Sequence, residues 1–416
     1  MNQVFRHVQS SRVCISVQVM RVDVLTKEYP PEIYGGAGVH VAELVKALRS
    51  DMSVQVRCFG SPRTEADVTS YPVPNTLVDA NAALQTMGID LAMADDVAGA
   101  DVVHSHTWYA NEAGRVAQLL HDVPHVVTAH SLEPLRPWKA EQLGGGYRLS
   151  SWIERAAYEA ADAVIAVSDG MRRDILRSYS SIDPERVKVV HNGIDVEAWR
   201  PTTNPELLER RGIDATLPTL VFVGRITRQK GLPYLLEAVT SLPRGVQVVL
   251  CAGAPDTPEI FDEVQSAVAK LQSSREGIIW IPDHLPRHEL AAILTAATAF
   301  VCPSIYEPLG IVNLEAMACG IPVVGTATGG IPEVVVDGET GWLVPIEQVQ
   351  DGTGTPLDPA QYVSDLASAL GAAVADPARA KAMGVAARER ARIHFDWVAI
   401  AQQTRSIYNE LVSARR

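Results

Sequence analysis

Residues 299–327, AFVCPSIYEPLGIVNLEAMACGIPVVGTA, decide the fold of this chain. The stretch begins with the apolar run AFVCPS, continues with helical periodicity over about 309–319, and ends with the apolar run PVVGTA at 322–327. Pro308 suits the start of the helix, and Gly320 suits its end. Two short β-branched runs joined by a helix are typical of a βαβ unit with parallel strands. The stretch therefore predicts an α/β domain.

The same alternation of short apolar runs and helical segments extends through most of the chain. In the first half, strands are predicted at 20–26, 53–59, 101–106, 125–130, 163–168 and 187–191. In the second half they are predicted at 219–224, 246–253, 278–283, 299–304 and 322–327, followed by helices at about 358–374, 377–392 and 397–413. The polar, proline-containing stretch 192–218 separates the two halves. We predict two doubly wound, Rossmann-like α/β domains that face a shared central cleft.

The composition excludes several classes of partner. The chain has 36 Lys and Arg against 49 Asp and Glu, a net charge of −13. This charge opposes binding to nucleic acid and to anionic lipid, so neither partner is expected. No window approaches 18 consecutive apolar residues, and the five scattered cysteines fit a reducing compartment. We expect a cytoplasmic protein with no membrane partner.

Residues 1–19 carry no motif and precede the strand-like run MRVDVLT at 20–26. We interpret them as an extension. Their deletion is expected to leave the melting temperature and the activity nearly unchanged. Thermal unfolding and an activity assay on the chain that starts at Met20 test this. A large loss of either would show that the segment packs into the first domain.

Of two glutamates in the opening stretch, one precedes the predicted helix and the other lies within it. The first N–H groups of this helix, near Leu309 and Gly310, form an anion site that the helix dipole strengthens. Glu315 lies about two turns further along, where a carboxylate can accept both hydroxyls of a ribose, and Glu307 precedes the helix at the cleft. The alternative is an amphipathic core helix with two surface glutamates.

A basic turn follows the first strand of the second half. In GRITRQKG, residues 224–231, Arg225 and Lys230 can reach one diphosphate. The alternative is a solvated basic turn. The segment is not a Walker A loop, which excludes ATP hydrolysis by P-loop chemistry.

A glycine-rich loop opens the first predicted helix. Gly35, Gly36 and Gly38 let backbone amides approach a phosphate closely. A dinucleotide fingerprint needs a further glycine at position 41, where the chain has Val41. Binding of NAD is therefore not supported.

Histidines gather at the predicted strand ends. His104 and His106 are two residues apart and could share one strand face, with His130 as a third zinc ligand. No second-shell carboxylate is evident near them, and the chain has no Asp-x-Asp triplet, so we expect no metal. Ser168 resembles a hydrolase nucleophile, but it lacks the first glycine of that motif and is better explained as a helix N-cap.

Together these motifs resemble the retaining GT-B glycosyltransferases. The resemblance rests on the Glu-x7-Glu element, Gly-Arg…Lys-Gly, the glycine-rich loop, His130 and HNGID at 191–195. It covers residues 20–416 and points to the bacterial glycogen synthase group. Two longer stretches, KEYPPEIYGGAGVHV at 27–41 and HSLEPLRPWKAEQLGGGYRLSSW at 130–152, are most similar to the actinobacterial branch that makes maltose 1-phosphate.

The resemblance implies a catalytic set in the cleft. Arg225 and Lys230 should hold the donor diphosphate and stabilise the charge that grows on it. Glu307 should hydrogen-bond the donor sugar, and His130 should lie near the C6 hydroxyl of that sugar. The implied reaction is a front-face transfer that retains the anomeric configuration and requires no metal or other cofactor.

The resemblance also implies a donor-binding set and a domain organisation. Glu315 should bind the ribose, Leu309 and Gly310 should offer N–H groups, and Gly36 should let the first loop approach the phosphates. The domains implied are an N-terminal acceptor-side domain at 20–192 and a C-terminal nucleotide-sugar domain at 193–395. A last helix at 396–416 should cross back to the N-terminal domain.

The segment after His130 predicts the acceptor. Arg136 and Lys139 suit a phosphate, and Trp138 suits the apolar face of a sugar. In the alternative, these cations pair with Glu133 and Glu141 on the surface. We predict transfer of glucose from ADP-glucose to glucose 1-phosphate, giving α-maltose 1-phosphate, with weaker elongation of α-glucan.

Other functions stay open at this point. A glycogen synthase that acts mainly on glucan, or another nucleotide-sugar transferase, would share most of these motifs. A sugar-nucleotide epimerase would share the fold but would leave the segment 130–152 unexplained. A non-catalytic sugar-binding protein would not need Arg225 and Lys230 on a diphosphate. The choice between ADP and UDP, and the oligomeric state, with a dimer as one option, are not fixed by the sequence.

Overall fold

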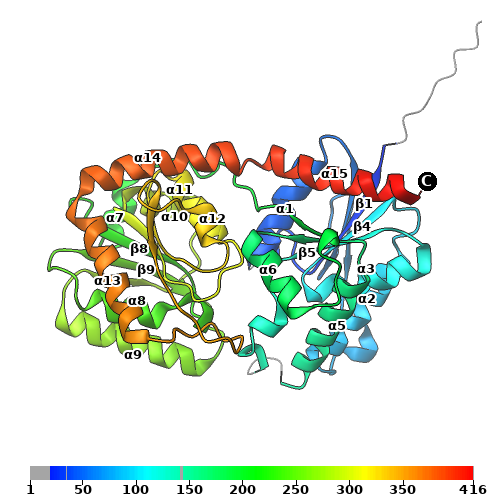
Figure 1. Ribbon diagram of the computed structural model, residues 1–416, viewed down its shortest axis with the longest axis horizontal. Helices are drawn as coiled ribbons and strands as arrows, with labels where there is room; N and C mark the ends of the chain where they lie inside the picture. The colour runs from blue at the N-terminus through cyan, green and yellow to red at the C-terminus, as the bar shows by residue number, and fades with distance from the viewer. Residues whose placement is uncertain (1–18, 34, 141–143, 416) are drawn as a thin grey trace, which may run out of the picture.

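The structure is a computed structural model that describes residues 19–33, 35–140 and 144–415. It contains two parallel sheets, one in each half of the chain (Figure 1). The seven-stranded sheet has the order β3 (Val68–Tyr71), β2 (Ser53–Phe59), β1 (Arg21–Thr26), β4 (Val102–His106), β5 (His125–Ala129), β6 (Ala163–Ala166), β7 (Val187–Val189). The six-stranded sheet has the order β10 (Ile278–Ile281), β9 (Gln247–Gly253), β8 (Thr219–Arg225), β11 (Ala299–Cys302), β12 (Val323–Thr326), β13 (Gly341–Val344). The prediction of two doubly wound α/β units is confirmed.

Helices cover both sheets. In the first half they are α1 (Gly36–Leu48), α2 (Ala82–Asp95), α3 (Trp108–His121), α5 (Gly146–Ala160) and α6 (Asp169–Ser178). In the second half they are α7 (Pro205–Arg210), α8 (Leu232–Val239), α9 (Pro258–Ser274), α10 (Arg287–Ala296), α11 (Ile311–Ala318), α12 (Ile331–Val334), α13 (Pro359–Ala375) and α14 (Pro377–His394). The last helix is α15 (Trp397–Arg415). Strands β4 and β5 are buried along their whole length, as expected for strands covered on two faces.

Two strands escaped the sequence analysis. β3 reads VTSY and β13 reads GWLV, and each has only four residues. Both lie at the edge of their sheet, β3 next to β2 and β13 next to β12. Edge strands need less apolar surface than central ones, so the periodic signal that identified the other strands is weak in them.

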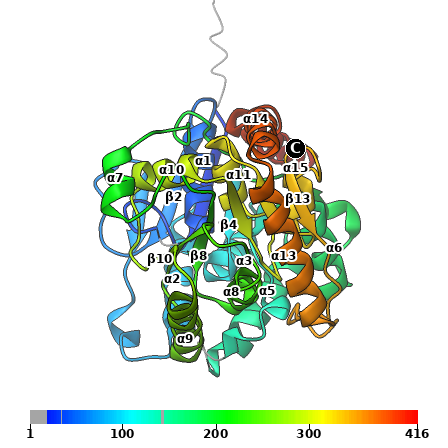
Figure 2. The same ribbon diagram turned by 90° about the vertical axis from the view of Figure 1, so that its left-hand side faces the viewer.

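The chain passes between the halves at two places that lie side by side. Ile194 N donates a hydrogen bond to the carbonyl of Phe395 at 2.7 Å, and Ile194 pairs with Asp396 as a parallel bridge. Beyond this point α15 runs along the first half, as Figures 1 and 2 show. Its residues Trp397 and Tyr408 are buried in the same apolar cluster as α1 and β1.

The polar stretch 192–218 was expected to be a connection throughout. The structure places a helix, α7, inside it, and α7 packs against α10 of the second half. Asn204 caps this helix by accepting a hydrogen bond from Leu207 N at 3.0 Å. Only the part before Asn204 therefore connects the two halves. The domain limits proposed at 192/193 and 395/396 stay predictions.

Among the residues that the structure describes, none of the helices is long and apolar enough to cross a membrane. The predicted extension, apart from Val19, lies outside the described residues.

Candidate active site

The predicted site residues come from the carboxyl ends of strands in both sheets. Arg225 ends β8, and His130 follows β5. Gly36 begins α1, and a side-chain carbon on it would lie 3.7 Å from the Cδ1 of Ile311, at the start of α11. The start of α1 in the first half therefore lies against the start of α11, the helix that carries Glu315. Such a meeting of strand ends is where doubly wound proteins bind ligands.

Lys230 and Glu307 form a close ion pair. The Nζ of Lys230 lies 2.6 Å from the Oε2 of Glu307, and Ser304 Oγ donates to the same oxygen at 3.0 Å. Gly231, next to Lys230, has φ of +63°, and a side-chain carbon there would lie 1.9 Å from the carbonyl oxygen of Pro303. Burial lowers the pKa of Lys230, but the charge of Glu307, its hydrogen bond and the neighbouring Cys302 together outweigh burial, so the pKa is raised. Lys230 is therefore a fixed cation at the cleft.

A second group of cations lies where the two halves meet. Arg225 Nη1 donates to Asp256 Oδ1 at 3.0 Å. We name residues 131–139 the acceptor loop. Lys139 of this loop is buried. Burial lowers the pKa of Lys139 to about 8, and the positive charges of Arg136 and Arg225 lower it further. Arg136 donates to Ser131 Oγ at 2.9 Å. Lys139 is thus close enough to both Arg136 and Arg225 for their charges to act on it.

The alternative pairing of the acceptor loop with Glu133 is not seen. The carboxylate of Glu133 accepts from Ser150 Oγ at 2.6 Å, and across the described parts of the chain neither Arg136 nor Lys139 has a carboxylate within 4 Å. Glu141, the other expected partner, lies outside the described residues. Trp138 is buried and lines a cavity of about 620 Å³ that it shares with Tyr234 of α8.

The start of the Glu-x7-Glu helix was predicted too early. α11 begins at Ile311, because Gly310 has φ of +90°, a left-handed conformation that cannot continue a helix. Leu309 is only 1% exposed and packs in the core. The N–H groups of the first turn therefore belong to Ile311 and Val312, and the N–H groups of Leu309 and Gly310 precede the helix. The predicted end is confirmed, since Gly320 with φ of +83° follows the last turn.

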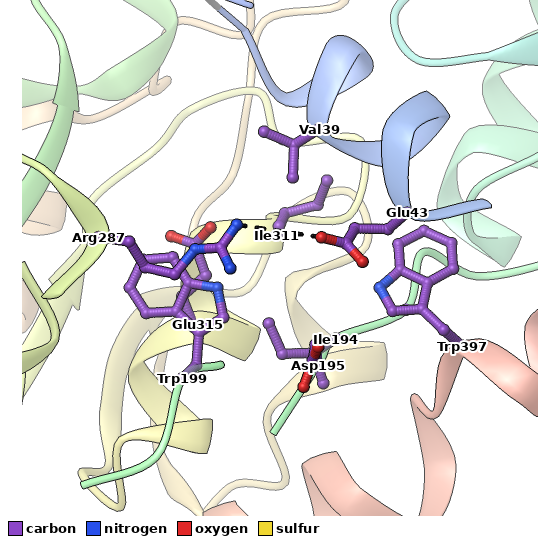
Figure 3. Close-up of a pocket in the computed structure, with 10 residues that line it drawn as sticks. Val39, Glu43, Ile194, Asp195, Trp199, Arg287, Ile311, Glu315 and Trp397 are labelled. Atoms are coloured by element: carbon purple, nitrogen blue, oxygen red, sulfur yellow. Dashed lines mark ion pairs between the residues drawn. The ribbon is translucent and has the colours of Figure 1, made fainter. Parts of the chain in front are cut away.

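Glu315 lies in a small pocket between the halves (Figure 3). Burial raises the pKa of Glu315 to about 7, while the charges of Arg287 and Lys230 act to lower it. The Nη2 of Arg287 lies 3.9 Å from the Oε1 of Glu43, on α1, and the guanidinium carbon is 5.9 Å from the centre of the Trp199 ring. Glu315 therefore changes charge near neutral pH, next to a cation that reaches the opposite half.

Three histidines meet at the carboxyl ends of β4 and β5. His106 Nδ1 lies 3.0 Å from His130 Nε2, and the His40 ring is 4.7 Å from the His130 ring. One ligand atom from each lies within 4.8 Å of the others, so this group could hold a metal ion. Burial lowers the pKa of all three, to about 4 for His40, so they are neutral. Neutral imidazoles can also donate to or accept from sugar hydroxyls.

His104 does not fit the alternative in which it binds a metal together with His106. Both nitrogens of His104 are used, with Tyr408 OH at 2.6 Å and Thr128 Oγ1 at 2.7 Å. His40 takes its place in the group. It lies on α1, and no strand-based pattern could have found it.

Other cleft residues were also missed by the sequence analysis. Lys27 follows β1, and its Nζ lies 3.9 Å from the centre of the Tyr109 ring, while burial lowers its pKa. Arg287 and Trp199 stand in segments without a recognisable motif. Of these three residues, only Lys27 could have been identified from the sequence, because it directly follows a predicted parallel strand.

Ser168 is the helix N-cap that the sequence predicts. Its Oγ accepts from Met171 N at 2.9 Å and donates to the Pro308 carbonyl at 2.6 Å. Nearby, the carboxylate of Glu333 accepts from Asp169 N and Gly170 N at 2.8 and 2.9 Å. These contacts join α6 of the first half to Pro308, which follows Glu307, and to α12 of the second half.

Comparison with known proteins identifies relatives over almost the whole chain. Residues 204–390 match the family Glycosyl transferases group 1, and residues 34–198 match Glycosyltransferase Family 4. An alpha-maltose-1-phosphate synthase of Mycolicibacterium smegmatis is 56% identical over 395 residues, covering 94% of this chain and 100% of that protein. A glycogen synthase of Mycobacterium tuberculosis is 30% identical, with 94% of each chain covered. The solved sucrose-phosphate synthase of Thermosynechococcus elongatus has the same fold, with a TM-score of 0.77 over 95% of this chain and all of that one, at 24% identity.

Proposed function

Because this chain belongs to the alpha-maltose-1-phosphate synthase family of GT-B glycosyltransferases, we propose that it transfers glucose from ADP-glucose to glucose 1-phosphate. The product is α-maltose 1-phosphate, and the anomeric configuration is retained. One observation carries the choice of acceptor. Among the described residues, buried Lys139 and its neighbour Arg136 have no carboxylate within 4 Å, and the charges of Arg136 and Arg225 act on Lys139 against the weaker influence of Glu133 and Asp256. Buried cations need a counter-charge, and an acceptor phosphate supplies it.

The second half binds the donor. Lys230 and Arg225 hold the diphosphate, with the N–H groups around Gly310 and the first turn of α11 as further donors. Glu315 accepts the ribose hydroxyls. Glu307, already held by Lys230 and Ser304, is oriented to accept hydroxyls of the donor glucose. Donor and acceptor are thus fixed by residues of opposite halves.

The proposed mechanism depends on where negative charge develops during glucose transfer. As the glycosidic bond breaks, negative charge grows on the leaving diphosphate, and Lys230 and Arg225 stabilise it. A leaving phosphate oxygen takes the proton of the acceptor hydroxyl, which attacks from the same face. His130 lies against the donor sugar near its C6 hydroxyl. The mechanism uses the cations of the chain and needs no metal or other cofactor.

A second activity, elongation of α-glucan, is favoured by Trp138. Trp138 lines a cavity together with Tyr234, Glu237 and Glu263. Aromatic faces and carboxylates are suited to the apolar faces and hydroxyls of a neutral glucan. We propose that glucan is a weaker acceptor than glucose 1-phosphate. The reaction is proposed to take place in the cytoplasm.

A grid of donors and acceptors tests this function. The purified protein is incubated with ADP-glucose or UDP-glucose, and with glucose 1-phosphate, glucan or no acceptor, and the released nucleoside diphosphate is measured. The expected result is the highest rate with ADP-glucose and glucose 1-phosphate. Activity on glucan but not on glucose 1-phosphate would make the enzyme a glycogen synthase, and conversion of the donor without an acceptor would indicate an epimerase or a hydrolase.

The pKa of Glu315, about 7, predicts a pH-dependent donor affinity. Only the carboxylate accepts both ribose hydroxyls, and at pH 6 about one tenth of a group with this pKa is ionised. The KM for ADP-glucose is therefore expected to rise about tenfold between pH 8 and pH 6. In Glu315→Gln, the KM for ADP-glucose is expected to be high and to stay constant between pH 6 and pH 8. The exposed Glu276→Gln is the control, and a pH-independent donor KM in the parent protein would contradict the assignment.

A further inference from the structure

A carboxylate of the second half caps a helix of the first half. Glu333, on α12, accepts hydrogen bonds at 2.8 and 2.9 Å from the backbone N–H groups of Asp169 and Gly170, the first two residues of α6. Its Oε2 also lies 3.0 Å from Nε2 of His191, which follows β7 of the first half. Figure 1 shows α12 and α6 facing each other where the two halves meet. One side chain therefore makes three polar contacts between the halves.

The charge of Glu333 suits this contact. The first N–H groups of a helix lack partners within the helix and lie at the positive end of its dipole, so a carboxylate stabilises them. Burial raises the pKa of Glu333, but the hydrogen bonds from His191, Gly170 N and Asp169 N together outweigh burial, and the pKa lies below its ordinary value. Glu333 is therefore ionised at neutral pH, and each of its two oxygens accepts from a backbone N–H group.

A glycine turn connects this contact to the donor site. Gly329 has φ of +56°, and a side-chain carbon on it would overlap the carbonyl oxygen of Glu307. Gly330 N donates to the same carbonyl at 3.0 Å. From the first half, a side-chain carbon on Gly170 would lie 2.5 Å from the carbonyl oxygen of Gly329. The turn thus lies between α6 and the backbone of Glu307, in contact with both.

Each partner in this contact is fixed within its own half. Arg390, on α14, donates to the carbonyl oxygens of Glu333 and Val334 at 2.7 and 2.8 Å, which holds α12 to the second half. Helix α6 is packed into the first half through the buried side chains of Met171 and Ile175. A displacement of α6 from α12 is therefore a displacement of one half relative to the other.

We propose that Glu333 is a positioning residue for the transfer step: by holding the start of α6, it sets the position of the first half relative to Glu307 and the donor glucose. The proposal rests on the proposed function, in which opposite halves hold the donor and the acceptor. When the contact is lost, each substrate keeps its main binding residues, so its affinity changes little. The attack of the acceptor hydroxyl needs both halves in place, and a displacement of about 1 Å can slow such a step by about 10²-fold.

The first variant, Glu333→Gln, removes the contact with a small change of shape. The amide has one oxygen, and its NH2 group would face an N–H donor of α6, so only one of the two backbone N–H groups keeps a partner. We expect kcat to fall about tenfold, while the KM values for ADP-glucose and for glucose 1-phosphate change by less than about threefold. The control is Glu339→Gln, which removes an exposed carboxylate close by in the chain and should behave as the parent.

The second variant, Gly170→Ala, separates the halves without changing Glu333. Alanine is a better helix former than glycine, so α6 itself is not destabilised. The added methyl group meets the carbonyl oxygen of Gly329, which cannot move without moving the turn next to Glu307. This variant should therefore lower kcat as Glu333→Gln does. Gly371→Ala is the matched control, because an added carbon at Gly371, on α13, meets no atom within 4 Å.

Hydrogen–deuterium exchange of the ligand-free proteins measures the contact directly. In the parent, Glu333 accepts from the amide of Asp169, so this amide should exchange slowly. It is expected to exchange about tenfold faster in both Glu333→Gln and Gly170→Ala, and at the parent rate in both controls. Exchange in the central strands β4 and β5 should be the same in all five proteins, which shows that the fold is intact.

The outcomes separate this inference from the proposed function. An unchanged kcat in either variant would overturn the positioning role, and faster exchange at α6 without a loss of kcat would leave Glu333 as a structural helix cap. A KM for ADP-glucose that rises as far as kcat falls would also overturn it, because Glu333 would then act on donor binding. The proposed function fails on a different result, namely a parent that uses glucan in place of glucose 1-phosphate. The same comparison of kcat with glucan then decides the role of Glu333.

Discussion

Lys230→Ala is expected to lower kcat by about 10²–10³ while the protein stays folded. The Nζ of Lys230 lies 2.6 Å from Glu307, so one side chain both faces the leaving diphosphate and orients the group that holds the donor sugar. Its cation is most useful when charge has built up on the leaving group, so kcat should fall more than donor affinity. Steady-state kinetics with saturating acceptor measure this.

The exposed Lys270→Ala is the matched control and should keep full turnover. Lys230→Ala leaves the buried carboxylate of Glu307 with Ser304 as its remaining partner, so its melting temperature should also fall. Circular dichroism separates this loss of stability from loss of the fold. A folded Lys230→Ala protein with near-normal kcat would refute the assignment.

The double change Arg136→Ala and Lys139→Ala is expected to raise the KM for glucose 1-phosphate by about 10²-fold or more. Each charged hydrogen bond to a phosphate contributes about 1.5–3 kcal/mol, and two are removed. Elongation of glucan should suffer much less, because a neutral acceptor does not use these charges. Kinetics of the same preparation with both acceptors measure the difference.

Arg173→Ala combined with Lys381→Ala removes two exposed cations and serves as the control. It keeps the same net charge as the test variant, so a general electrostatic effect on an anionic substrate would appear in both. Equal losses on glucose 1-phosphate and on glucan in the test variant would remove the phosphate role from Arg136 and Lys139.

The sheets were predictable because their central strands are buried on two faces and read as continuous apolar runs. β4 and β5 illustrate this, since every residue in them is buried. The edge strand β13 and the helix α7 were not found, because a short element that gains its stability from one neighbour leaves little periodicity in the sequence. The start of α11 was predicted too early for a different reason. Pro308 is a good first residue for a helix, but Gly310 adopts a left-handed conformation that the sequence does not reveal.

The candidate site was predictable where a residue stands next to a strand end. Lys230 and Glu307 belong to such segments, and the structure brings them into contact. His40 and Arg287 come from helices, and their place in the cleft depends on how the two halves are packed together. Glu133 was expected to pair with cations at the surface, whereas its carboxylate is buried and accepts from Ser150 Oγ, a contact that depends on how α5 packs against the loop.

The course of α15 has a consequence for how the protein is made. The apolar surface of α1 is covered by Trp397, Ile400 and Tyr408, which belong to the last nineteen-residue helix of the chain. Multidomain chains usually fold from the N-terminus while synthesis continues. Here the half that leaves the ribosome first is completed by a helix that follows the second half in the chain, so its core closes only after the whole second half has been translated.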